Sequence, residues 1–133
     1  MSYSTQGSLD TNIILRWILG DIEDQTKKTD QLINSGKLLN VSALVIAEVV
    51  YVLEAKDFTR AQIKVIVERL SSQKNLCFMR SVVIPAIKLY SQHPSISFVD
   101  ACLIYEATES YAEPLYTFDK KLANKDPKRI KLL

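Results

Sequence analysis

The sequence has few of the residues that mark disulfide-rich, metal-thiolate or linker-rich proteins. It has one histidine and only two cysteines, Cys77 and Cys102, which lie far apart and form no Cys-x-x-Cys pair. A disulfide scaffold is therefore excluded, and a reducing cytoplasm is the expected compartment. Three glycines and four prolines leave little room for flexible linkers. Cys102 lies in an apolar run and is expected to be a buried free thiol.

Membrane and targeting segments are also missing. The longest apolar runs are far shorter than a membrane span. The first residues lack the charged and apolar regions of a signal peptide. These features predict a soluble protein with no membrane contact.

Neither sign of charge predominates, since the net charge is only +2. The chain as a whole is therefore not a general polyanion binder. Its C-terminal segment 120–133 nevertheless carries six basic residues against Asp126 alone. A basic end beside an acidic cluster would suit a ligand with a phosphate backbone. A solvated lysine-rich surface explains the same feature equally well.

The 133 residues, of which 47% are hydrophobic, fit a single domain over residues 1–133. Short β-like runs alternate with longer helical patterns, which predicts an α/β fold with a short, mostly parallel sheet flanked by helices. Sites in such folds lie at the carboxyl ends of the strands. Helices are expected over 12–19, 21–35, 43–55, 82–91 and 97–111 and after Thr59, with Pro85 in a first turn. Strands are expected over 38–41, 115–118 and 130–133, and a strand or a turn over 75–79.

Four acidic residues are poorly explained by local structure. Asp10 and Asp119 each directly follow a candidate strand, whereas Glu48 and Asp100 lie on helices among apolar neighbours. Asp100 is the only polar residue between Phe98 and Tyr105. A buried carboxylate needs a partner or a metal ion, because its isolated burial costs several kcal/mol.

Simpler explanations exist for each acid. Asp10 and Asp119 would also serve as helix caps, and Glu48 would also fit a solvent-facing helix edge; a solvated position is the weakest explanation for Asp100. Taken together, the four favour a site for Mg²⁺ or Mn²⁺, which prefer hard oxygen ligands. Such ions activate water and stabilise a leaving oxygen in phosphoester hydrolysis.

The segments that hold these acids resemble those of a known family. Leu9-Asp10-Thr11-Asn12, Ala47-Glu48, Phe98-Val99-Asp100-Ala101 and Thr117-Phe118-Asp119 look like the signature segments of PIN-domain ribonucleases, in the same order along the chain. Within that family the sequence is most similar to VapC-type toxins of prokaryotic toxin–antitoxin pairs. The resemblance implies a Rossmann-like PIN fold and metal-dependent endonucleolytic cleavage of RNA.

The resemblance also implies roles for individual residues. Asp10, Glu48, Asp100 and Asp119 would be the catalytic, metal-binding acids, holding Mg²⁺ or Mn²⁺. Thr117 would orient Asp119 or a water at the metal, and Asn12 would act similarly near Asp10. Arg16 and Lys121, close in sequence to these acids, are candidates for contact with substrate phosphate. The implied partners are RNA, a cognate antitoxin and a second copy of the chain, with Ile14, Trp17 and Ile18 as exposed apolar contacts for the antitoxin.

Two positions depart from the family pattern. Tyr3–Ser8 is polar where members usually begin with an apolar strand, so residues 1–8 are expected to be irregular or an altered start. Lys121 stands where some members carry a further acid, which leaves open whether one metal ion or two are bound.

Three other functions share features with this sequence. A haloacid-dehalogenase-type phosphatase needs a second Asp where this chain has Asn12, and a response-regulator receiver needs paired acids that are absent. A non-catalytic RNA-binding or protein-interaction module with the same fold is the alternative from another class. His93 precedes Pro94 outside the motifs and is not expected to be catalytic.

Overall fold

The computed structural model describes residues 5–133, and the chain divides into two compact units, Met1–Met79 and Arg80–Leu133. Part of the expected irregular start, residues 1–4, lies outside the described residues. Both units combine helices with short parallel strands, which confirms the α/β class. None of the helices described is long and apolar enough to cross a membrane.

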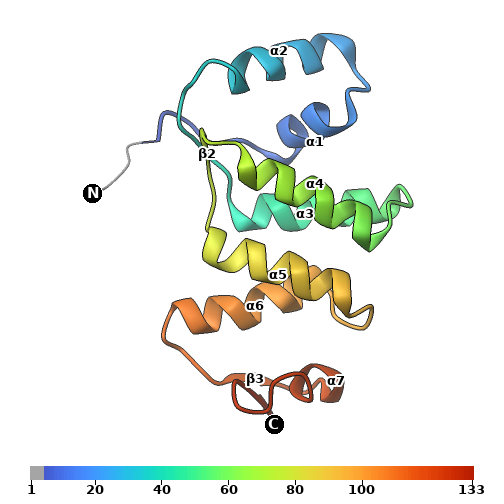
Figure 1. Ribbon diagram of the computed structural model, residues 1–133, viewed down its shortest axis with the longest axis vertical. Coiled ribbons are helices and arrows are strands. Elements are labelled where there is room, and N and C mark those ends of the chain that lie inside the picture. Colours follow the sequence, from blue (N-terminus) through green and yellow to red (C-terminus); the bar gives the residue numbers. More distant parts are fainter. Residues whose placement is uncertain (1–4) are drawn as a thin grey trace. The chain divides into compact units, whose positions relative to one another are not determined.

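The first unit is mainly helical and encloses its own apolar core. Helix α1 packs against α2 and α3, and α3 packs against α4 (Figure 1). Buried aliphatic side chains from all four helices and both strands fill the space, including Ile14, Ile33, Ile46, Ile63 and Leu76. Its elements are α1 (Thr11–Leu19), α2 (Glu23–Ile33), β1 (Leu39–Asn40), α3 (Ala43–Ala55), α4 (Arg60–Ser72) and β2 (Leu76–Cys77).

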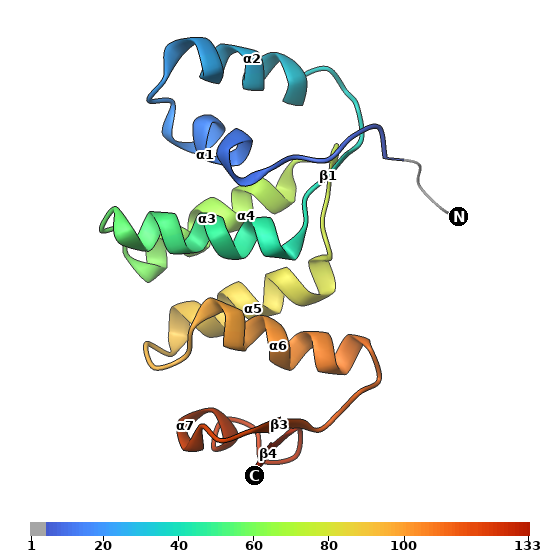
Figure 2. The ribbon, with the colours of Figure 1, turned by 180° about the vertical axis from the view of Figure 1, so that it is seen from behind.

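The chain that leads into Asp10 runs beside β1, which Figure 2 labels. Ser8 pairs with Asn40 in a parallel bridge. The Asn40 N–H donates to the Gly7 carbonyl at 2.8 Å, and the Leu9 N–H donates to the Asn40 carbonyl at 2.9 Å. These bonds join backbone atoms, so the polar side chains of this segment do not prevent its pairing. Strands β1 and β2 are parallel in turn, with Leu39 opposite Leu76.

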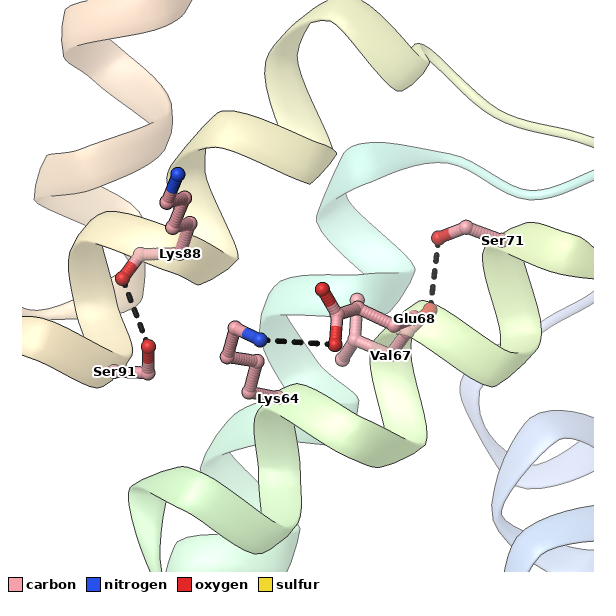
Figure 3. Close-up of polar contacts among 6 residues, drawn as sticks. All are labelled: Lys64, Val67, Glu68, Ser71, Lys88 and Ser91. Carbon is pink, nitrogen blue, oxygen red and sulfur yellow. Dashed lines mark hydrogen bonds and ion pairs between the residues drawn. The ribbon is translucent and has the colours of Figure 1, made fainter.

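Helices α3 and α4 begin at the capping residues that the sequence predicts. Ser42 accepts a hydrogen bond from the Leu44 N–H, and Thr59 forms a reciprocal capping box with Gln62. Such caps satisfy backbone donors that a helix leaves unpaired at its first turn. Within α4, Lys64 contacts Glu68 at 3.1 Å, and the Ser71 hydroxyl donates to the Val67 carbonyl at 2.8 Å (Figure 3).

The second unit is built on the packing of α5 against α6 (Figure 1). The rings of Tyr90 and Phe98 meet edge to face, with centroids 6.0 Å apart. Strands β3 and β4 pair in parallel with Leu115 opposite Ile130, which confirms the predicted pairing of 115–118 with 130–133. The elements are α5 (Arg80–Gln92), α6 (Phe98–Glu109), β3 (Leu115–Thr117), α7 (Lys120–Ala123) and β4 (Ile130–Leu132).

The start of α5 differs from the prediction. The helix begins at Arg80, two residues before the expected start, so Pro85 lies in its second turn rather than its first. Proline has no N–H and cannot donate to the carbonyl four residues earlier, that of Ser81. The buried side chains Val82, Val83, Ala86 and Ile87 surround this position in sequence, and their packing outweighs the lost hydrogen bond.

The expected single sheet is also divided among shorter pieces. Within residues 5–133, the strands form two separate two-stranded sheets, β1 with β2 and β3 with β4. Both pairings are parallel, as predicted. Each strand has only two or three residues, which is less than the apolar runs suggested.

Candidate functional site

Asp10 is the N-cap of α1 and is exposed to solvent. Buried Leu9 and the backbone pairing beside β1 fix the chain immediately before it. Its Oδ1 accepts a hydrogen bond from the Ile13 N–H at 3.1 Å. In the described part of the chain, no hydrogen bond to its other carboxylate oxygen is present. The cap therefore fixes the carboxylate and leaves an oxygen for a ligand.

Glu48 lies next to the same helix terminus through a side-chain contact. The Thr11 hydroxyl, at the first position of α1, donates to Glu48 Oε2 at 2.7 Å. Glu48 is exposed on α3, whereas its neighbours Val49 and Val50 are buried. Because Thr11 directly follows Asp10, the structure brings two of the four predicted acids to one end of α1.

Asp100 occupies the third position of α6. Ser97 caps that helix, and its Oγ accepts a hydrogen bond from the Asp100 N–H at 3.0 Å. The expectation of a buried carboxylate is wrong, because Asp100 is half-buried. The helix turns Phe98, Ala101 and Cys102 into the core and leaves Asp100 at its edge. A partly exposed acid in the first helical turn is stabilised by the helix dipole and needs no buried partner.

Asp119 follows β3 directly, as predicted, and caps α7. Its Oδ1 accepts from the Lys121 N–H at 2.9 Å and from the Leu122 N–H at 3.2 Å. The Thr117 hydroxyl oxygen accepts from the Asp119 N–H at 3.0 Å. Thr117 thus holds the backbone of Asp119 rather than its carboxylate. As with Asp10, the capping explanation is correct and leaves a carboxylate oxygen outside the cap.

Asn12 and Arg16 line a cavity between α1 and α2. The cavity has a volume of about 370 Å³, and Asp10 is also part of its wall. Arg16 forms an ion pair with Asp21 at 3.1 Å, so its charge is partly neutralised. Lys121 is exposed in the second unit and contacts Asp119 through its backbone N–H. The cavity is lined by Asp10, Asn12, Ile13, Arg16, Gln25, Lys28, Thr29 and Leu32.

The predicted apolar contact surface on α1 needs a correction. Ile14 is fully buried, at 0% exposure, because it faces the core of the first unit. Trp17 and Ile18 are half-buried and line a smaller hollow of about 180 Å³ together with Ile66 and Leu70 of α4. Of the three expected contact residues on α1, only Trp17 and Ile18 are therefore accessible, and they lie beside residues of α4.

Two further residues, Thr11 and Ser97, contact the predicted acids, and the sequence analysis assigns a role to neither. Thr11 lies within the Asp10 motif, but the supporting role there was assigned to Asn12 alone. Ser97 lies three residues before Asp100, a Ser-x-x-Asp spacing that indicates a helix N-terminus. That spacing was a usable signal for Ser97. No short-range signal in the sequence connects Thr11 with Glu48, which is 37 residues away.

The chemistry of the donor atoms suits a hard divalent cation. Each unit supplies two carboxylates together with hydroxyl groups, and such oxygen donors favour Mg²⁺ or Mn²⁺ over metals that select thiolate ligands. Across residues 5–133 no three His, Cys, Asp or Glu side chains form a group that could hold a metal ion. Neither unit taken alone therefore contains a complete predicted metal site.

The remaining nucleophile and base candidates have other environments. Burial raises the pKa of the Cys102 thiol to about 12, and the charge of Glu106 adds to the increase. The thiol is therefore protonated at neutral pH and unsuited to nucleophilic attack or metal binding. His93 Nδ1 lies 3.0 Å from the Lys125 amino group.

A comparison with protein families matches the PIN domain over residues 8–127. The matched segment contains all four predicted acids and extends across both units. No curated protein matches the chain, and no solved structure matches it either. PIN domains are generally nucleases, and those nucleases generally use divalent metal ions. Since the match covers far more than half of its length, this chain belongs to the PIN domain family.

Proposed function

We propose that the protein is an endoribonuclease that depends on Mg²⁺ or Mn²⁺ and hydrolyses phosphodiester bonds of RNA. The observation that carries the proposal is the family match over residues 8–127, a segment that contains Asp10, Glu48, Asp100 and Asp119. We assign these four acids as the catalytic, metal-binding residues. All four carboxylates are exposed or half-buried and can therefore be reached by an ion from solvent.

The local contacts support this assignment because they position the acids without using all of their oxygens. Asp10 and Asp119 each cap a helix through Oδ1. Glu48 accepts from Thr11 through Oε2. A divalent cation bound by these carboxylates would lower the pKa of water and stabilise the leaving oxygen. The chain's own contribution is to hold the oxygen ligands in place before the ion and the RNA arrive.

The same proposal includes a biological setting. The motif resemblance supports a VapC-type toxin that acts in the cytoplasm as a homodimer. Its partner would be an antitoxin whose C-terminal segment covers the acids. The half-buried Trp17 and Ile18, with Ile66 and Leu70, offer an apolar hollow on the first unit for part of such a contact. Lys121, exposed beside Asp119, and Arg16 would contact phosphate groups of the RNA.

The test is cleavage of a panel of single-stranded and hairpin RNAs with Mg²⁺, with Mn²⁺ and with EDTA. The wild-type protein should cut with either metal and stop in EDTA. Asp10→Asn and Asp100→Asn should each abolish cleavage, while Glu109→Gln, also on α6 but exposed near its other end, should not. Undiminished cleavage by both Asp variants would contradict the assignment. RNA binding without cleavage by the wild type would favour a non-catalytic RNA-binding module instead.

A further inference from the structure

We propose that the cavity between α1 and α2 is a binding site for one nucleotide unit of the RNA, next to the bond that is cut. The inference rests on the proposed ribonuclease function and adds to it a place where the substrate is held. It concerns the first unit alone, because all residues that line the cavity belong to residues 10–32.

The position of the cavity connects it with the catalytic acids. Asp10 forms part of its wall, so a molecule bound inside lies against one of the proposed metal-binding carboxylates. Its volume of about 370 Å³ falls in the range of small-molecule sites in proteins. A nucleotide placed here would leave its phosphate near Asp10.

The chemistry of the walls matches the three parts of a nucleotide. Ile13 and Leu32 offer apolar contact for the face of a base. The side-chain amides of Asn12 and Gln25 can donate to and accept from the edges of a base. Arg16 and Lys28 supply positive charge for phosphate. A bare phosphate ion would use only the last pair and would leave the apolar walls unoccupied.

Arg16 gives the strongest single indication. Its side chain is only 15% exposed, and Asp21 contacts Nη1 at 3.1 Å. Its Nε is buried, and among the described residues no acceptor reaches it. A buried donor without a partner costs free energy, and a guanidinium has five N–H donors to satisfy. Arg16 is also part of the cavity wall, so an acceptor on a bound nucleotide would contact N–H groups of its guanidinium other than Nε.

Neighbouring residues on α2 provide matched variants. Lys28 lines the cavity, whereas Lys27 is exposed on the same helix and does not. Gln25 lines the cavity, whereas Gln31 is exposed and does not. We would compare Lys28→Ala with Lys27→Ala, and Gln25→Trp, which fills the cavity, with Gln31→Trp. Since all four side chains are on the surface, circular dichroism should confirm that every variant remains folded.

The measurement is equilibrium binding in EDTA, where no cleavage occurs, of a fluorescent single-stranded RNA and of a nucleoside monophosphate. Lys28→Ala and Gln25→Trp should weaken RNA binding by on the order of tenfold, as expected for loss of a phosphate contact or of the base's place in the cavity. Lys28→Ala should also reduce the slope of log affinity against log salt by about 0.7. The two control variants should bind as the wild type does.

Kinetics then separate this inference from the ribonuclease proposal. If the wild type cleaves RNA, both cavity variants should raise KM and leave kcat nearly unchanged. Equal binding by cavity and control variants would overturn the nucleotide site even if cleavage is normal. Competition by inorganic phosphate as strong as that by the nucleoside monophosphate would reduce the cavity to an anion site and also overturn it. If the wild type never cleaves, the binding comparison still decides whether the cavity holds a nucleotide.

Discussion

The hydroxyl of Thr11 donates a hydrogen bond of 2.7 Å to the carboxylate of Glu48. The contact joins the start of α1 to the middle of α3. It holds Glu48 beside Thr11, which directly follows Asp10, and both acids are proposed metal ligands. Threonine at this position therefore acts on Glu48 through positioning.

Thr11→Val should lower RNA cleavage by about 10-fold to 100-fold, the usual cost of removing a group that orients a metal ligand. Valine has almost the same shape but cannot donate, so α1 should remain folded. Thr11→Ser keeps the hydroxyl and should retain most of the activity. The required Mn²⁺ concentration, measured by activity titration, should rise for Thr11→Val only. Equal metal dependence of the two variants would show that Thr11 does not position Glu48.

Asp10 allows its two roles to be separated. Asparagine caps helices about as well as aspartate, whereas alanine removes the cap at a cost of about 1 kcal/mol. Asp10→Asn should therefore keep the melting temperature of the metal-free protein and lose cleavage. Asp10→Ala should have a lower melting temperature and should also lose cleavage. Thermal melts in EDTA and cleavage assays on the two variants would test this; full activity of Asp10→Asn would show that Asp10 is only a cap.

Metal binding should stabilise the fold. An ion that binds only the folded protein contributes about 2.7 kcal/mol at a hundredfold excess over Kd, a shift on the order of 10 °C for a domain of this size. Wild type should show the shift with millimolar Mn²⁺, and Asp100→Asn should reduce it. Glu109→Gln, on the same helix, should not. A wild-type melting temperature that is the same with Mn²⁺ as in EDTA would contradict the proposed metal site.

Cys102 predicts a dependence of stability on alkaline pH. Its folded pKa is raised from the ordinary value of 9.0 to about 12, so the folded protein keeps a proton that the unfolded chain releases. The stability associated with this thiol is fully present below pH 9.0 and is lost as pH rises toward 12. Unfolding by urea from pH 8 to 11 should show a steeper loss for wild type than for Cys102→Ala. Equal slopes would mean that the thiol titrates normally.

His93 should be dispensable for cleavage. Its ring nitrogen lies 3.0 Å from the Lys125 amino group, which identifies a local contact of the second unit. His93→Gln should therefore leave kcat within about twofold of wild type at each pH. A loss of the kind that general-base removal causes, about 100-fold or more, would place the histidine in the mechanism.

The sequence predicted the helices and the parallel pairing well because periodicity and capping residues are local signals. Ser42 and Thr59 begin α3 and α4 as their side-chain chemistry requires. The burial of Asp100 was predicted wrongly because neighbours in sequence do not reveal which side of a helix faces the core. The same limit explains Ile14, which proved to be a core residue.

The contact between Thr11 and Glu48 could not be predicted, because it depends on how α1 and α3 pack. The start of α5 was missed because proline was assumed to require a first turn. The four acids, in contrast, could be selected as candidates from the sequence, because Glu48 and Asp100 have apolar neighbours and all four lie in segments that resemble those of the PIN family.

The corner between α1 and α2 has a thermodynamic consequence for whatever enters the cavity. Three contacts converge on Arg16: Asp21 holds its guanidinium, while its carbonyl accepts from the Gly20 N–H at 2.9 Å and from the Thr26 hydroxyl at 3.3 Å. Gly20 allows the tight turn by adopting a left-handed conformation, with φ of 59°. The loss of conformational entropy at this corner accompanies folding rather than association. We therefore expect binding there to depend on desolvation and contact, with little reordering of the α1–α2 turn.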